Sequence, residues 1–309
     1  MTDSVLRLRG LRKRYGDFVA VDDLDLDVPR GCVLGFLGPN GAGKTTTIRM
    51  ILGIYEPSGG TIEVLGTPSA LDVRHRIGYL PEEKGLYKKM KARDLIAYFA
   101  ELKGMKSKDA RQRAIELLDR YGLGEFKERK CDALSKGMGQ KVQVLASIAH
   151  RPEFVILDEP FSGLDPVNQQ VMEQVIADLS KDGSTIVFST HDLEKAEHLC
   201  DRIAMLARGK KVFDGTLQEA FAALPKRIVI GTSAESAALQ ALSGVTSVAR
   251  GRVDGTYELG LSQDASPDGI LTACIRAGHE VRSFDKREPG LRELFFDRVG
   301  AKDAAEMLA

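Results

Sequence analysis

A glycine-rich loop between an apolar segment and a helical pattern constrains the fold of this chain most strongly. Residues 32–37 are apolar throughout, which predicts a parallel strand covered on both faces. Gly38-Pro39-Asn40-Gly41-Ala42-Gly43-Lys44-Thr45 follows directly, and a helical pattern runs from Thr46 to Leu52. A phosphate-binding P-loop requires a strand, this loop and a helix in that order. The sequence therefore predicts an α/β core that binds nucleotide phosphates.

The residue types in this loop each have a chemical role. Glycines let backbone N–H groups wrap around phosphate oxygens, and the start of the helix adds positive potential. We expect Lys44 to reach the β- and γ-phosphates and the Thr45 hydroxyl to bind Mg²⁺.

Two further strand ends carry side chains suited to hydrolysis. Asp158 and Glu159 follow the apolar residues Phe154–Leu157, and His191 follows the strand-like residues 185–190. Ligands bind at the carboxyl edge of a parallel sheet, where these side chains emerge. We expect Asp158 to hold Mg²⁺, Glu159 to act as general base and His191 to contact the γ-phosphate or orient the water. The remaining histidines are expected to be surface or satisfied core groups: His75, His150, His198 and His279.

Composition argues against several other classes of protein. The chain has 44 basic and 44 acidic residues, so no long-range attraction to nucleic acid is predicted. No apolar run approaches the roughly 18 residues that span a membrane, and the N-terminus lacks the apolar centre of a secretory signal. A cytosolic location is expected. The four cysteines form no Cys-x-x-Cys pair, which predicts reduced, mostly buried thiols.

The periodicity of apolar residues changes along the chain. Residues 5–28 alternate between apolar and charged, which predicts half-exposed antiparallel strands. Residues 94–105 and 107–121 have apolar residues at helical spacing, with Ser107 as N-cap and Gly104 and Gly122 as stops. Residues from about 90 to 150 are therefore predicted to form a helical insertion.

A second domain is predicted from residue 225, because Pro225 and the charged residues after it mark a boundary. Strands are expected at 227–230, 245–249, 256–261 and 280–284, and helices at 234–242, 267–277 and 291–299. The order βαββαβ indicates a small ferredoxin-like α+β unit with an extra helix, extending to residue 309.

The motifs occur in the order found in an ATP-binding cassette (ABC). Besides those above, the chain contains Leu134-Ser135-Lys136-Gly137-Met138-Gly139-Gln140 and Ser162-Gly163-Leu164-Asp165. The chain resembles this family from residue 4 to about 220. The resemblance implies a P-loop NTPase cassette over residues 1–224, with an antiparallel β subdomain and the helical insertion. It also implies an ATPase that binds ATP and Mg²⁺ and works as a homodimer or heterodimer.

In such a dimer, the resemblance places Ser135, Gly137 and Gln140 among the nucleotide-binding residues, facing the γ-phosphate on the partner's P-loop. Asp165 would lie across the dimer seam. Tyr15 would stack on adenine, since an aromatic face supports a base. The nucleotide-binding set is then Tyr15, Gly38, Pro39, Asn40, Gly41, Ala42, Gly43, Lys44, Thr45, Thr46, Ser135, Gly137 and Gln140.

The chain departs from the family pattern at two positions. Glu82 stands where a glutamine is usual, and Lys136 replaces the first glycine of the signature. A carboxylate at 82 still suits Mg²⁺ but adds negative charge near the phosphates. The Lys136 charge favours phosphate, whereas its side chain limits backbone approach. Both substitutions are therefore expected to affect turnover.

Residues 79–87 and 288–296 are similar to segments of cassette subunits from bacterial exporters of sodium ions or drugs. This similarity implies a separate transmembrane permease subunit, to which the chain binds at the cytoplasmic face of the membrane. Leu86, Tyr87 and Met90 could form that contact, or a local hydrophobic staple.

The sequence leaves two other functions open. One is a cassette protein acting on ribosomes or DNA, although no second P-loop or heptad pattern is present. The other is a regulatory ATP-binding module whose small carboxyl-terminal domain senses a ligand, for which Glu82 and Lys136 are the best support.

Overall fold

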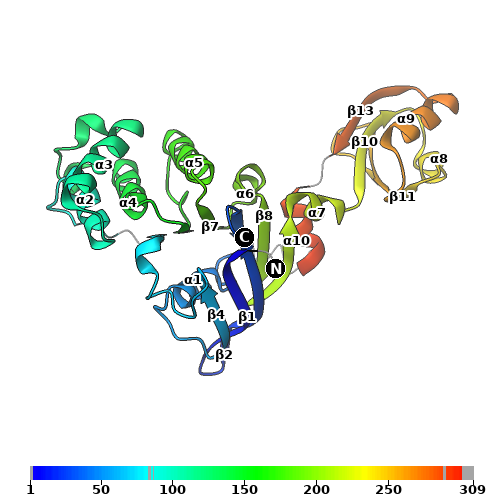
Figure 1. Ribbon diagram of the computed structural model, residues 1–309. Coiled ribbons are helices and arrows are strands. Elements are labelled where there is room, and N and C mark those ends of the chain that lie inside the picture. The colour runs from blue at the N-terminus through cyan, green and yellow to red at the C-terminus, as the bar shows by residue number, and fades with distance from the viewer. Residues whose placement is uncertain (1–2, 83–84, 86, 288–289, 301–309) are drawn as a thin grey trace. The chain divides into compact units, whose positions relative to one another are not determined.

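The computed structural model describes residues 3–82, 85, 87–287 and 290–300 (Figure 1). Leu86, one of the three residues expected at a membrane-subunit contact, lies outside this range. The described chain divides into two compact units, residues 3–216 and 217–300. This division falls before the helix Leu217–Ala222 (α7), whereas the predicted boundary, at residue 225, falls after it.

A six-stranded sheet forms the centre of the first unit, with the order β5-β6-β7-β3-β8-β9. All neighbours are parallel except β8 and β9. The strands are β3 (Val33–Leu37), β5 (Ile77–Leu80), β6 (Phe154–Asp158), β7 (Thr185–Thr190), β8 (Arg202–Ala207) and β9 (Lys210–Thr216). Every residue of β3, β6 and β7 is buried, which confirms the prediction of parallel strands covered on both faces.

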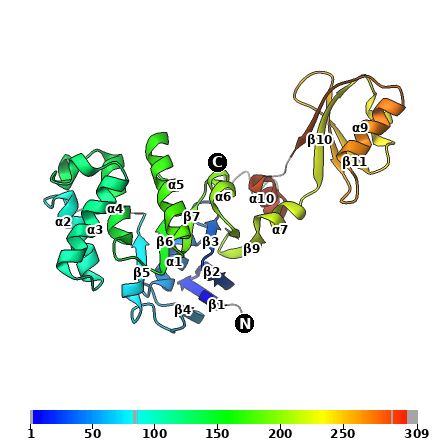
Figure 2. The same cartoon turned by 45° about the horizontal axis from the view of Figure 1, so that its top comes forward.

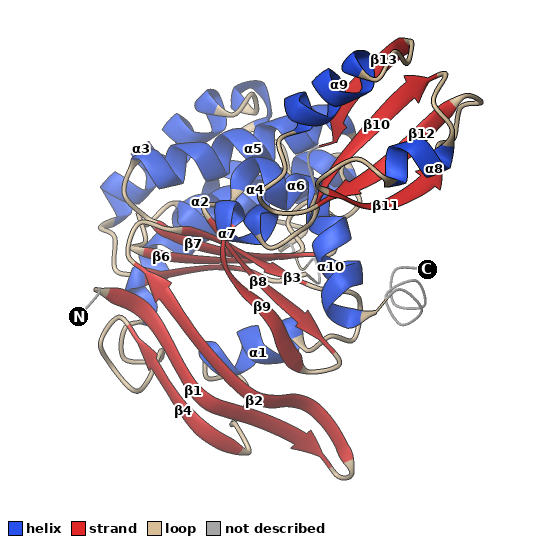
Figure 3. Cartoon of the chain, turned by 90° about the vertical axis from the view of Figure 1, so that its right-hand side faces the viewer, coloured by secondary structure: helices blue, strands red, loops and turns tan. Residues whose placement is uncertain are grey.

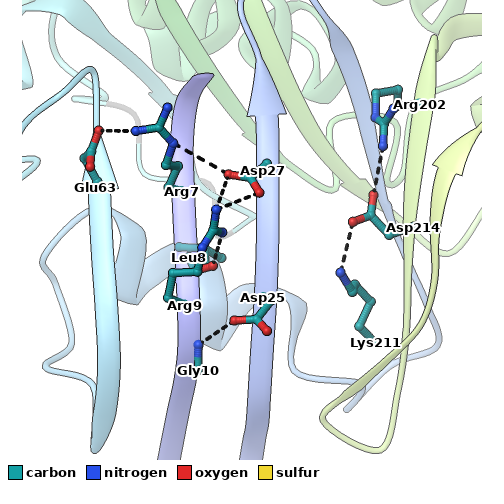
Figure 4. Close-up of polar contacts among 10 residues, drawn as sticks. All are labelled: Arg7, Leu8, Arg9, Gly10, Asp25, Asp27, Glu63, Arg202, Lys211 and Asp214. Atoms are coloured by element: carbon teal, nitrogen blue, oxygen red, sulfur yellow. Dashed lines mark hydrogen bonds and ion pairs between the residues drawn. The ribbon is translucent and has the colours of Figure 1, made fainter. Parts of the chain in front are cut away.

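A second sheet of the first unit has the order β2-β1-β4 and is antiparallel. Its strands are β1 (Ser4–Tyr15), β2 (Phe18–Pro29) and β4 (Gly59–Val64). The predicted antiparallel strands at 5–28 are therefore confirmed. Arg7 lies between Asp27 and Glu63, and Arg9 donates two 2.8 Å hydrogen bonds to Asp27, as Figure 4 shows. Such exposed pairs add little stability, but their opposite charges favour this strand pairing over others.

Helix α1 (Lys44–Ile51) lies between the two sheets, and the other helices of the first unit lie on the opposite face of the six-stranded sheet (Figure 3). A hydrophobic core joins α1 to strands of both sheets. The remaining helices are α2 (Ala92–Leu102), α3 (Ser107–Arg120), α4 (Lys136–Ile148), α5 (Pro166–Lys181) and α6 (Leu193–Leu199). Burial of the apolar side chains of α1 thus fixes the position of the loop that precedes it.

The predicted helical insertion contains α2, α3 and α4, which lie together in Figure 1. Gly104 and Gly122 follow α2 and α3 with φ of 97° and 73°, so both end a helix in the left-handed conformation as expected. The N-cap of α3 lies one residue before its predicted position. Lys106 has the extended backbone of an N-cap, and Ser107 is the first helical residue.

The second unit contains a four-stranded antiparallel sheet with the order β11-β12-β10-β13. Its elements are α7, β10 (Lys226–Thr232), α8 (Ser236–Gln240), β11 (Val245–Arg250), β12 (Thr256–Leu261), α9 (Pro267–Arg276), β13 (Val281–Arg287) and α10 (Leu291–Val299). Side chains from α8 and α9 pack on one face of the sheet in a small core, and Figure 2 shows α9 along that face. The element order and strand order are those of the predicted ferredoxin-like unit. The helix expected at 234–242 is shorter than predicted.

Candidate active site

The loop between β3 and α1 has a backbone that only glycine accommodates at two positions. Gly38 and Gly43 have φ of 151° and 101°. A Cβ atom would lie 2.4 Å from the Leu206 carbonyl oxygen at Gly38 and 2.5 Å from the Ala20 carbonyl oxygen at Gly43. Both obstacles are backbone atoms, so the loop needs glycine for steric as well as conformational reasons.

Lys44 is held inside this loop. Its Nζ donates to the carbonyl oxygens of Gly38 and Pro39 at 2.6 and 3.2 Å, and it lies 3.4 Å from a carboxylate oxygen of Glu159. Its side chain is only 6% exposed. The loop therefore positions one buried positive charge where the helix N-terminus already attracts anions.

Asp158, at the end of β6, meets two hydroxyl groups. Its Oδ1 accepts hydrogen bonds from Ser189 at 2.5 Å and from Thr45 at 3.4 Å. Its Oδ2 is buried and has no hydrogen-bond partner among the described residues. A buried, unsatisfied carboxylate oxygen beside a hydroxyl is an arrangement that a hard cation such as Mg²⁺ would complete.

Glu159 follows with a left-handed backbone, φ 47°, which costs a non-glycine residue on the order of 1–3 kcal/mol. Its N–H donates to the Ser189 hydroxyl at 3.0 Å, and its Oε2 lies 3.1 Å from Nδ1 of His191. The Glu159 side chain is 8% exposed, whereas His191 is 54% exposed. The structure thus brings Glu159, His191 and Lys44 together, from three separate segments.

Lys44, Thr45 and Glu159 line a cavity of about 350 Å³. Its lining is Phe18, Ala20, Pro39, Asn40, Gly41, Ala42, Gly43, Lys44, Thr45, Thr46, Glu82 and Glu159. All the loop residues proposed for nucleotide binding except Gly38 are included, together with Glu82. Tyr15 is absent from the lining; its ring instead stacks edge-on with Tyr55 at 6.4 Å. Phe18, which is 64% exposed, provides the aromatic surface of this cavity and was not singled out from the sequence.

The signature residues do not line this cavity of their own chain. Ser135 is the N-cap of α4 and its hydroxyl accepts a hydrogen bond from the Met138 N–H at 3.2 Å. Gln140 is buried and donates to the Pro160 carbonyl at 2.7 Å. Gly137 lies against Asn168, where an added Cβ would be 2.3 Å from the amide nitrogen. The signature turn therefore forms the N-terminal end of α4, and Gln140 connects α4 to the loop after β6.

Asp165 caps α5, because its carboxylate accepts hydrogen bonds from the backbone and side chain of Asn168 at 2.9 and 2.7 Å. The backbone hydrogen bond from Asn168 is the largest cause that lowers the pKa of Asp165. Asp165 therefore stays ionised next to the signature turn.

The four cysteines are free and buried, which confirms their prediction as unpaired thiols. Among the described residues, no group of three or more histidine, cysteine or acidic side chains could hold a metal ion. Among the same residues, no helix has the length and apolar character needed to cross a bilayer.

Comparisons with known proteins identify both parts of the chain. Residues 21–162 match the family model of the ABC transporter, and residues 215–299 match that of the carboxyl-terminal domain of DrrA1-3-like ATP-binding proteins. An uncharacterized ABC transporter ATP-binding protein of Bacillus subtilis, YhaQ, is 39% identical over 96% of this chain and 99% of its own. The daunorubicin resistance ATP-binding protein DrrA3 of Streptomyces coeruleorubidus is 35% identical over 97% of both chains.

A solved ATP-binding subunit of an ABC transporter has the same fold in its cassette. It superposes with a TM-score of 0.65 at 31% identity, over 70% of this chain and 92% of that structure. The expected P-loop cassette fold and ATPase class are therefore confirmed. The chain belongs to the family of ABC transporter ATP-binding proteins, which bind and hydrolyse ATP.

Proposed function

We propose that this chain is the ATP-hydrolysing subunit of an exporter, and that it drives a separate transmembrane permease subunit by closing and opening as a dimer. The observation that carries the hydrolytic part is the contact of Lys44 and His191 with Glu159 beside the P-loop cavity. Relatives such as DrrA3 are named for drug resistance. Outward transport of a drug would produce such resistance, which supports export as the direction of transport. The chain would then work in the cytoplasm, at the inner face of the membrane.

The residues at this site fit Mg²⁺. The Thr45 hydroxyl and the unsatisfied Oδ2 of Asp158 would hold the ion, with Glu82 at the cavity wall as a further oxygen donor. Since the described residues form no complete metal site, phosphate and water oxygens would supply the other ligands. When bound, Mg²⁺ neutralises charge on the β- and γ-phosphates.

The protein groups have distinct roles in the proposed hydrolysis. Glu159 accepts a proton from the attacking water while the bond between the γ-phosphorus and the bridging oxygen breaks. Its left-handed backbone and the contact with His191 fix the direction of the carboxylate. Lys44 leaves the carbonyl oxygens of its loop and stabilises the transferring phosphoryl group.

The signature turn would complete the site from a second cassette. Ser135 and the N–H groups at the start of α4 would contact the γ-phosphate on the partner's P-loop, which suits a helix N-terminus. Loss of that phosphate on hydrolysis would release the two cassettes, and the movement would reach the permease. Tyr15 remains a proposed adenine contact, together with Phe18, which lines the cavity.

Substitution of Glu159 tests the hydrolytic role. We expect Glu159→Gln to keep ATP binding, to lower the hydrolysis rate by about 10²–10⁴-fold and to accumulate ATP-bound dimers. Glu101→Gln, at an exposed position on α2, is the matched control. Undiminished turnover in Glu159→Gln would refute the general-base role.

The membrane partner needs a separate experiment. The native complex would be extracted from membranes with detergent, and the co-purifying chain identified by mass spectrometry. Stimulation of ATP hydrolysis by transported solutes in the reconstituted complex would support export. Recovery of the chain only with ribosomes would contradict it.

A further inference from the structure

A second cavity of the first unit lies at the edge of the parallel sheet opposite to the active site, and has a volume of about 480 Å³. Three segments line it: Arg113 on α3, residues 148–153 between α4 and β6, and residues 179–184 between α5 and β7. Because β6 has five residues, this cavity lies about 16 Å from Asp158 along the strand. The cavity is therefore separate from the nucleotide site, but it lies at the opposite ends of β6 and β7, the strands that lead to Asp158 and His191.

Arg113 enters this cavity with an unused donor. Its Nε is buried and has no hydrogen-bond partner among the described residues. The nearest acidic oxygen, on Glu116, is 3.7 Å from Nη1, which is too far for a good hydrogen bond. A buried guanidinium donor without a partner is unfavourable. Burial lowers the pKa of Arg113, and the positive charge of Arg151 lowers it further.

Arg151 brings a second guanidinium group to the same cavity. Its backbone is left-handed, with φ of 56°, an unfavourable conformation for a residue with a long side chain. Within the described part of the chain, its side chain makes no hydrogen bond or ion pair. The carboxyl ends of α4 and α5 offset part of this positive charge. They leave the Nε donor of Arg113 unused.

The acidic residues of the cavity do not neutralise both arginines. Glu153 is already bound by Arg76, whose Nε and Nη2 donate to it at 2.6 and 2.8 Å, and by Arg30 at 3.3 Å. Asp182 is the other acid in the lining. Within the lining, the two guanidinium groups therefore face one carboxylate that no other arginine binds, and Glu116 lies outside the lining at 3.7 Å from Arg113.

We propose that this cavity binds a small oxyanion, a carboxylate or a tetrahedral phosphate-type group, held by Arg113 and Arg151. The planar guanidinium group matches both anions by paired hydrogen bonds, and an anion would satisfy the buried Nε. Arg113 belongs to the helical insertion, whereas Arg151 lies three residues before β6, the strand that ends at Asp158. An anion bound to both arginines would therefore link the helical insertion to the strand that carries Asp158. Through this link it would act as a regulatory ligand.

Thermal unfolding tests this site without relying on activity. The full chain, saturated with Mg²⁺ and ADP to fill the P-loop, would be unfolded in sodium sulfate and in sodium chloride of equal ionic strength. We expect sulfate to raise the midpoint of the unmodified chain by at least about 2 °C more than it raises that of Arg113→Gln or Arg151→Gln. Arg111→Gln, exposed on the same helix, should behave as the unmodified chain does.

Equal sulfate effects in all four proteins would overturn the proposal, because they would reflect general exclusion of sulfate from protein surfaces. Backbone amide NMR of the unmodified chain provides a second measurement, which does not depend on how the variants fold. Titration with sulfate, and separately with acetate, should shift the signals of Gly183 and Ser184 saturably. A saturable response to acetate alone identifies the ligand as a carboxylate, and a response to sulfate alone identifies a phosphate-type group. Absence of both contradicts the proposal.

Discussion

Two buried aspartates of the first unit, Asp158 and Asp178, differ in how fully their oxygens are satisfied. Asp178, on α5, accepts hydrogen bonds from Tyr121 at 2.9 Å and Gln174 at 2.8 Å. It also forms an ion pair with Arg120 at 2.7 Å. Asp158 has both its hydrogen bonds on one oxygen, and the other is buried without a partner. Asp178 is 7% exposed and Asp158 is 1% exposed, so burial alone does not distinguish the two.

The difference indicates a structural role for one aspartate and a binding role for the other. Asp178 connects α5 to the end of α3, and its partners lie within the protein, so its role is structural. Asp158 retains an unused oxygen beside the P-loop, at a cost in stability that only a ligand can recover. An unsatisfied buried group thus points to a binding site, whereas a satisfied one points to the fold.

The largest effect is expected from Asp158→Asn, on turnover. Loss of the carboxylate should lower Mg²⁺-dependent ATP hydrolysis by about 10³-fold, because several kcal/mol of charge stabilisation depend on the metal. The free energy of unfolding of the nucleotide-free protein should change by no more than about 1 kcal/mol, since the lost charge was incompletely satisfied. Steady-state kinetics and urea unfolding measure the two quantities.

Asp72→Asn, at an exposed position, is the control for both measurements. A large loss of stability without a loss of turnover in Asp158→Asn would reverse the roles assigned to the two aspartates.

Asp178→Ala should show the opposite pattern. We expect a loss of about 2–4 kcal/mol in the free energy of unfolding, because the buried Tyr121 hydroxyl and the Arg120 guanidinium lose their shared acceptor. ATP affinity should change less than twofold at temperatures where the variant is folded. Calorimetric titration with ATP checks the second expectation, and a tenfold weaker affinity would mean that the contact with α3 also shapes the nucleotide site.

A pH measurement extends the comparison to a partly buried group, His150. Burial lowers its pKa to about 4, followed by the positive charge of Lys103. The unfolded chain therefore binds more protons between pH 6.5 and 4, and stability should be lost as the pH falls through this window. The loss is expected to be roughly 1–3 kcal/mol, and His150→Gln should remove it. Denaturant unfolding at pH 4.5 and 7.5 would show an unchanged pH dependence in this variant if the assignment is wrong.

The sequence carried strong local signals for one of these regions and weak signals for the other. Thr45, Asp158 and Glu159 follow apolar strands, and parallel topology brings such ends to one edge of the sheet, so their proximity could be predicted. Asp178 lies 57 residues from its partner Tyr121, and no short motif joins the two. Its role depends on how α3 packs against α5, which is a tertiary property.

Other features of the site depend on tertiary structure in the same way. Tyr15 remains a proposed adenine contact, and the turn after it places Phe18, which no motif singled out, in the cavity lining. His150 was expected to be a satisfied core or surface group; its Nε2 lies 3.1 Å from the Ile77 carbonyl, but its Nδ1 is buried without a partner among the described residues. Local periodicity predicts which elements form, but it does not report the partners of an individual polar atom.

The smallest effect, and the sharpest test of the contrast, is expected from Tyr121→Phe. This change removes one hydrogen bond to Asp178 but leaves Gln174 and Arg120 in place, so it should cost about 1 kcal/mol at pH 7. Burial raises the pKa of Asp178, but hydrogen bonds from Tyr121 and Gln174 and the charge of Arg120 outweigh it and keep the pKa below its ordinary value.

Because the folded-state pKa of Asp178 is lowered, its contribution is present above the unfolded-state pKa of about 3.9 and is lost as the pH falls. Loss of the Tyr121 donor should raise the folded-state pKa, so the destabilisation by Tyr121→Phe should shrink between pH 7 and pH 3. Urea unfolding at both pH values measures this. Tyr98→Phe, on the exposed side of α2, should show no such dependence. A destabilisation that is equal at both pH values would mean that the Tyr121 hydroxyl acts through packing, and that Asp178 is satisfied without it.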